Sequence, residues 1–249
     1  MDRKLAGVGV ALMLLIGGVQ GGIATAAVAC PRQLPQGSEP VTLDPADFVA
    51  RIDNPYLPFP RNARWVFRET DRGGTSQKVT VTVTTNRKKI LGIDATVVHD
   101  VVTQKGHLVE NTFDWYAQDT CGNVWYLGEN TKEYENGRVV STAGSWEAGV
   151  DGAQPGVVMP ADLQVGLSYR QEYLAGEAED SAAILSLTEQ AQVPFGHFRD
   201  VVLTKEITPL EPRLLEYKLY AKGIGVVLAI AVSGGSDREE LVRYLPPSA

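Results

Sequence analysis

Three carboxylates in the middle of the sequence have the residue type and the setting for acid–base chemistry. Asp114, Glu129 and Glu147 lie among aromatic residues. Glu110 and Asp114 share one face of a predicted strand, but four residues at ~3.3 Å each separate them by ~13 Å, whereas glycosidase pairs need ~5–9.5 Å. A working pair would therefore join Asp114 to Glu129 or Glu147, as in a carboxylate-dependent hydrolase, lyase or cyclase. Solvated carboxylates are the competing interpretation, so the sequence leaves open whether the protein is an enzyme.

Aromatic side chains in the same region supply a candidate binding surface. Tyr116, Trp125, Tyr134 and Trp146 are the residues that we expect to contact a ligand. Flat rings stack on carbohydrates or line a cavity for an apolar ligand, so both are candidate partners. The competing interpretation is ordinary core packing. It is weakest for Trp125, beside a predicted strand end, and for Trp146, in a Gly-rich segment.

No pattern in the sequence predicts a metal site or a cofactor. The three histidines are His99, His107 and His197. His107 and Glu110 resemble a ligand pair, but residues three apart on a strand face opposite sides. Neither Cys-x-x-Cys nor His-Glu-x-x-His spacing occurs, so we expect no metal and no cofactor.

The N-terminus predicts export. Residues 1–29 combine Arg3 and Lys4, an apolar run and small residues before Cys30, which is the order of a secretory signal peptide. Cys30 and Cys121 are the two cysteines, and an even count in an oxidising compartment predicts a disulfide between them. The alternative is a lipid anchor at Cys30, because Ala27 to Cys30 resembles a lipobox. Either way, the protein is expected to be secreted or in the cell envelope.

The charge balance excludes two classes of partner. The chain has 23 basic and 30 acidic residues, a net charge of −7. Nucleic acid and anionic membrane surfaces both require clustered Lys and Arg, so neither is expected. No segment after the signal peptide is long and apolar enough to be a transmembrane segment.

The elements that would position these residues are predicted to be β-strands, with little helix. Residues 30–60 are a Pro-rich extended lead-in, with one short helical stretch near Asp44 and Pro45. From Trp65 onward the apolar period is two, as in Val79, Val81 and Val83, which predicts half-buried strands. Residues 61–249 are expected to form a single all-β domain.

A constant offset of 104 residues predicts an internal duplication. Trp65 corresponds to Tyr169, Gly92 to Gly196, and Trp115, Tyr116 and Ala117 to Leu219, Tyr220 and Ala221. Two similar antiparallel meanders, about 61–127 and 165–232, would form a barrel or half-barrel sandwich. The loop 128–164 would join them and gate the interior, with a small hairpin around Asn136-Gly137. Chance similarity of two meanders is the competing interpretation.

Two segments resemble known families. One resembles exported bacterial proteins of unassigned function. It comprises Phe113-Asp114-Trp115-Tyr116-Ala117-Gln118-Asp119, Gly122-Asn123-Val124-Trp125-Tyr126 and Ser145-Trp146-Glu147. Residues 220–227 are similar to the late hairpin of periplasmic half-barrel lipid carriers. Neither family supplies catalytic residues to transfer.

The leading functional expectation is a secreted, non-enzymatic binding protein for a small apolar or lipid-like ligand. It depends on the duplication, the aromatic residues and the absence of catalytic spacings. The alternatives are the carboxylate-dependent enzyme and a cell-surface structural or interaction module, which a lipidated Cys30 and a filled interior would favour.

Overall fold

A computed structural model describes residue 30 and residues 33–247. The predicted signal peptide, 1–29, lies outside the described residues. The predicted all-β class is confirmed: strands form one antiparallel, nearly closed barrel-shaped sheet. The described helical structure is the 3-10 turn η1 (Pro45–Asp47), where the Asp44 side chain accepts from Ala46 N and Pro45 occupies the first turn, as predicted.

The strands of the first half follow one another as hairpins. They are β2 (Arg64–Thr70), β3 (Ser76–Ile90), β4 (Ile93–Gln104), β5 (His107–Asp119) and β6 (Val124–Asn130), preceded by β1 (Phe48–Val49). The predicted alternation is visible in β3, where Val79 and Val83 are buried and Val81 shares their face.

The second half repeats this order. Its strands are β11 (Ser168–Arg170), β12 (Glu172–Tyr173), β13 (Ser181–Val193), β14 (Gly196–Ile207), β15 (Leu215–Ala221), β16 (Gly225–Ser233) and β17 (Arg238–Leu245). The bounds of β13 and β14 lie 103 to 105 residues after those of β3 and β4. This correspondence supports the predicted duplication, which stays a prediction.

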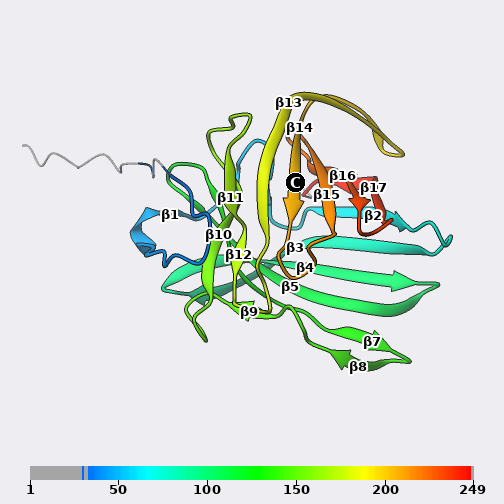
Figure 1. The fold of residues 1–249 in the computed structure, drawn as a ribbon, viewed down its shortest axis with the longest axis horizontal. Helices are drawn as coiled ribbons and strands as arrows, with labels where there is room; N and C mark the ends of the chain where they lie inside the picture. The colour runs from blue at the N-terminus through cyan, green and yellow to red at the C-terminus, as the bar shows by residue number, and fades with distance from the viewer. Residues whose placement is uncertain (1–29, 31–32, 248–249) are drawn as a thin grey trace, which may run out of the picture.

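Two seams turn the sheet into a barrel. On one side β17 pairs with β2 over the full length of β2. On the other side β6 pairs with β10 (Gln154–Met159), β10 pairs with β12, and β11 pairs with β13. In Figure 1, β3, β4 and β5 run across the picture while β13 and β14 stand across them, so the two halves face each other around an interior.

The segment 128–164, expected to be a gating loop, carries strands of its own. The Asn136-Gly137 pair has positive φ at both residues and turns β7 (Glu133–Glu135) into β8 (Arg138–Ser141), as predicted. β9 (Trp146–Glu147) pairs with β6, and β10 belongs to the barrel seam. The segment therefore forms part of the barrel wall.

A disulfide joins the lead-in to the turn after β5. Cys30 is bonded to Cys121, with their Cα atoms 5.6 Å apart, so the predicted pairing is confirmed. The sulfur of Cys30 is consequently not free for a lipid anchor. A disulfide agrees with the extracytoplasmic location that the N-terminus predicts. Lead-in residues Leu34 and Ile52 pack in the same buried cluster as Trp115 and Trp125 of the sheet.

Candidate functional site

An inner cavity of about 250 Å³ lies inside the barrel. One part of its wall is apolar, with Leu57, Phe59, Trp65, Phe67, Ile224 and Val226. The other part carries polar and charged groups, with Asp100, Asp114, Tyr116, Lys218, Tyr220 and Glu239. These residues come from the lead-in and from both halves of the sheet, so only the assembled barrel creates the cavity.

The first half contributes a cross-strand pair of carboxylates. Asp114 of β5 lies directly opposite Glu129 of β6, which places their Cβ atoms about 5 Å apart. The Tyr126 hydroxyl donates to Asp114 Oδ1 at 2.7 Å. The rings of Tyr116 and Tyr126 stack, with centroids 4.8 Å apart. Two of the three candidate catalytic residues are thus adjacent, beside a candidate ligand-binding tyrosine.

Trp146 extends this group through β9. Its ring meets Tyr126 edge-on at 5.3 Å, and its Nε1 donates to Glu172 Oε2 at 2.8 Å. Trp146 is opposite Glu129 in the register and so lies on the same face of the sheet as Asp114, but it is not among the residues that line the inner cavity.

Burial shifts the titration of these carboxylates upward. It raises the pKa of Asp114 to about 7 and that of Glu129 to about 8, and the nearby carboxylates Glu129 and Glu172, respectively, add to the rise. The pKa of Glu172 is raised to about 8 for the same first reason, with Asp180 adding to it. These groups hold protons at a pH where ordinary carboxylates are ionised, which suits them to donate hydrogen bonds or exchange protons.

The second half contributes a lysine that is already paired. Lys218 Nζ lies 2.7 Å from Glu206 Oε2 and 3.3 Å from Glu216 Oε2. Burial alone would lower the pKa of Lys218, but these two carboxylates raise it above its ordinary value. Glu206 Oε1 also accepts from Thr204 Oγ1 and from the hydroxyl of Tyr220. Lys218 and Glu206 therefore form a satisfied network.

Glu147 and Tyr134 lie away from this group. Glu147 is paired with Gly128 in the β6–β9 register, one position along from the Glu129–Trp146 pair, so its side chain is on the opposite face of the sheet. There it accepts from Lys88 Nζ at 2.7 Å, and Lys88 lies over the Trp115 ring. This removes Glu147 from the candidate carboxylate pair. Tyr134 is on the β7–β8 hairpin, outside the lining of the inner cavity.

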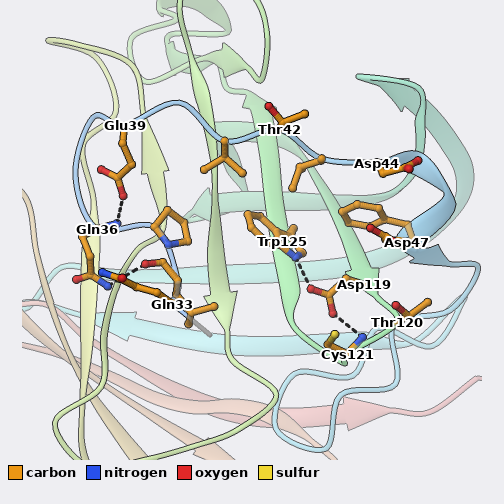
Figure 2. Close-up of a pocket in the computed structure, with 15 residues that line it drawn as sticks. Gln33, Gln36, Glu39, Thr42, Asp44, Asp47, Asp119, Thr120, Cys121 and Trp125 are labelled. Carbon is orange, nitrogen blue, oxygen red and sulfur yellow. Dashed lines mark hydrogen bonds between the residues drawn. The ribbon is translucent and has the colours of Figure 1, made fainter. Parts of the chain in front are cut away.

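Trp125 borders a different hollow, which we call the lead-in groove. Figure 2 shows the groove between the lead-in and the end of β5. At about 700 Å³ it is the larger of the two. Its central carboxylate, Asp119, already accepts from four donors: the backbone N of Cys121 and of Asn123, Asn123 Nδ2 and Trp125 Nε1. Because Asp119 and Trp125 are committed to each other, we interpret the groove as structural and place the candidate site in the inner cavity.

Sequence reasoning missed Asp100, Lys218 and Glu239, all of which line the inner cavity. The available signal was a charge on an otherwise apolar strand face. Asp100 shares a face with Val98 and Val102, both buried. A carboxylate in such a row indicates an interior polar group.

Two further features bear on the kind of site. Among residues 33–247 and Cys30, no three His, Cys, Asp or Glu side chains are placed to hold a metal ion. Within the same residues, helical structure nowhere has the length and apolar character needed to cross a bilayer.

No family model matches the sequence, and no curated protein matches it significantly. Two solved structures resemble the chain, each at 13% identity and covering 76% of this chain and 98% of their own. One is a predicted exported protein with YmcC-like fold from Bacteroides fragilis, with a TM-score of 0.44, and the other is a predicted lipoprotein from Parabacteroides distasonis, with a TM-score of 0.41. At this distance neither contributes an argument about the site.

Proposed function

We propose that the protein binds a small apolar or lipid-like ligand in the inner cavity and does not transform it. The observation that carries this proposal is the cavity itself, with an apolar wall inside a barrel. Cavities of about 150 Å³ lined by apolar groups already bind benzene. The inner cavity is larger, at about 250 Å³, and several of its apolar side chains would gain contacts with a ligand.

The lead-in helps to shape the site. Phe59 packs edge-on against Trp65, with ring centroids 6.1 Å apart, and its ring is tilted against that of Tyr116 at 4.9 Å. Trp65 Nε1 donates to the carbonyl of Ile224 at 2.8 Å, which fixes the ring against the turn that precedes β16. The apolar wall is thus preorganised, and preorganisation lowers the entropic cost of binding.

The first test is native mass spectrometry and lipid extraction of protein purified from its own host. We expect a co-purifying apolar molecule or, after its removal, binding of 1-octanol measured by calorimetry. Ala229 lines the cavity, so A229F should fill it and remove octanol binding, whereas V232F, at an exposed position of the same strand, should not. A protein that carries nothing and binds no octanol would contradict the proposal.

The enzyme alternative is supported by one observation, the adjacency of Asp114 and Glu129 with their raised pKa values. A hydrolase, lyase or cyclase activity that D114N and E129Q both abolish would establish it over simple binding. The cell-surface module is not favoured, because Cys30 is in a disulfide and the interior contains a cavity.

A further inference from the structure

The inner cavity continues into a second hollow, which we call the acidic mouth. The mouth has a volume of about 370 Å³ and shares Lys218, Ala229 and Glu239 with the inner cavity. Its remaining lining residues are Glu69, Glu216 and Asp237. Along β2, the residues on the inward face therefore change from Trp65 and Phe67 in the inner cavity to Glu69 in the mouth. The combined hollow is apolar at one end and acidic at the other.

The carboxylates of this hollow outnumber the cationic side chains that could pair with them. In the described part of the chain, Lys218 is the one cationic side chain that lines either part of it. Lys218 is already committed to Glu206 and Glu216. Asp100, Glu69 and Glu239 make no ion pair with any described residue.

Two of these carboxylates oppose each other directly. Glu239 of β17 is the register partner of Glu69 of β2, and like charges at such positions destabilise a sheet. Glu239 lines both hollows, together with Asp100 in the inner cavity and with Glu69 in the acidic mouth. Burial raises the pKa of Glu239 to about 8, and the nearby carboxylates Asp100 and Glu69 add to the rise. The protein therefore carries a destabilising arrangement at this point of the barrel.

Asp100 adds an independent indication of a ligand. Its Oδ1 is buried and, among the described residues, has no hydrogen-bond partner. Such an atom costs free energy unless a donor reaches it. Because Asp100 lines the inner cavity, a donor on a ligand in the cavity can contact it.

We propose that the hollow binds an amphiphilic amine, with the protonated nitrogen near Asp100 and Glu239, which both line the inner cavity, and the apolar part against Trp65 and Phe67. This inference rests on the proposed binding function and names its ligand class. An ammonium group supplies both positive charge and N–H donors, and an alkyl chain fills the apolar end. A metal ion fits less well, because it needs at least three converging ligands, which the described residues do not offer, whereas two carboxylates can hold an ammonium. A metal ion would also leave the apolar wall without a partner.

The test compares three probes with the same chain: octylamine, 1-octanol and octanoate, titrated by calorimetry into the full-length mature protein at pH 8.5. At that pH the amine is protonated and the carboxylates of the hollow are largely ionised. We expect octylamine to bind at least about tenfold more tightly than 1-octanol, the effect of one charged hydrogen bond. Octanoate should bind more weakly than either.

Variants assign the effect to the named carboxylates. D100N and E239Q should each weaken octylamine binding roughly tenfold and leave 1-octanol binding within about twofold. Each removes one of several neighbouring negative charges, so both variants are expected to fold. E177Q, at an exposed turn, is the matched control and should change neither affinity.

The outcomes separate this inference from the proposed function. If 1-octanol binds and octylamine binds no more tightly, or if D100N and E239Q leave octylamine binding unchanged, the amine class is wrong and the apolar-ligand function stands. If none of the three probes binds, both proposals fall.

Discussion

The two halves of the barrel carry different chemistry at corresponding positions. At the offset of 104 residues, Asp114 and Tyr116 of β5 correspond to Lys218 and Tyr220 of β15. Both pairs line the inner cavity. The tyrosines match, but the charge is reversed, so the barrel brings one acid and one base to related places on its wall.

The partners of these two residues differ as well. Lys218 has two carboxylates within 3.3 Å, and Glu206 accepts from two hydroxyl groups besides. Asp114 accepts one hydrogen bond from Tyr126 and faces a second acid, Glu129. The charged groups of the second half are therefore paired with one another and stabilise the fold. The first half instead has carboxylates that only a ligand or a proton can neutralise. Four predictions test that division.

The largest expected effect concerns the disulfide that joins the lead-in to the first half. The two cysteines are 91 residues apart in the sequence, so the disulfide closes a long loop. The chain-entropy model gives a stabilisation of about 4–5 kcal/mol for a loop of this length. We expect the double variant C30S/C121S to lose about that much free energy of unfolding in urea titrations. If the double variant lost no more than about 0.5 kcal/mol of free energy of unfolding, as a surface substitution does, the stability of the first half would not depend on the lead-in.

The second prediction breaks the Lys218 network. K218M leaves Glu206, which is 6% exposed, without its cation, and removing one partner of a buried pair costs about 3 kcal/mol. D114N at the corresponding position should cost much less, because it relieves repulsion with Glu129. Equal losses in the two variants, measured by urea unfolding at pH 8, would contradict the difference between the halves.

The third prediction uses pH. The pKa values of Asp100 and Asp114 are raised to about 7, and those of Glu129, Glu172 and Glu239 to about 8. Between the ordinary values of carboxylates and these raised values, the folded state binds more protons than the unfolded state. Stability is therefore greatest at low pH in this window and falls as the pH rises toward 8.

We expect the free energy of unfolding to fall by at least about 1.4 kcal/mol per pH unit between pH 5 and pH 8, because each excess proton that the folded state binds contributes that slope. D100N/D114N should flatten the slope, and E177Q should leave it unchanged. A protein that becomes more stable over this range would show that the interior acids are not buried as the structure has them.

The smallest expected effect is at Glu147. Its ion pair with Lys88 is partly exposed, with each side chain at 33%, and such pairs contribute about 0.2–1 kcal/mol. E147Q should therefore change stability by about 0.5 kcal/mol and leave octanol binding unaltered. A complete loss of binding would return Glu147 to the candidate site.

Local sequence patterns predicted what depends on neighbours along the chain. The Val79–Val83 alternation, the Asn136-Gly137 turn and the cap at Asp44 each follow from a few adjacent residues. The Cys30–Cys121 pair followed from counting, since only one intramolecular pairing was available.

The site depended on contacts between distant strands, so it was only partly predictable. Asp114, Glu129 and Tyr116, which were predicted as candidates, lie near one another. Glu147 depends on the β6–β9 register, which places it on the other face. Glu239 is interior because β17 closes the barrel against β2. Nothing in the residues around Glu239 indicates that closure, and an acid in a polar stretch is ordinarily solvated.

The disulfide also sets an order of events during biogenesis. Cys30 precedes its partner by 91 residues, so a chain that emerges N-terminus first presents the Cys30 thiol before Cys121 is available. Until Cys121 has emerged, the intramolecular bond cannot form. Closure of the lead-in over the sheet is therefore a late step, which follows the arrival of β5.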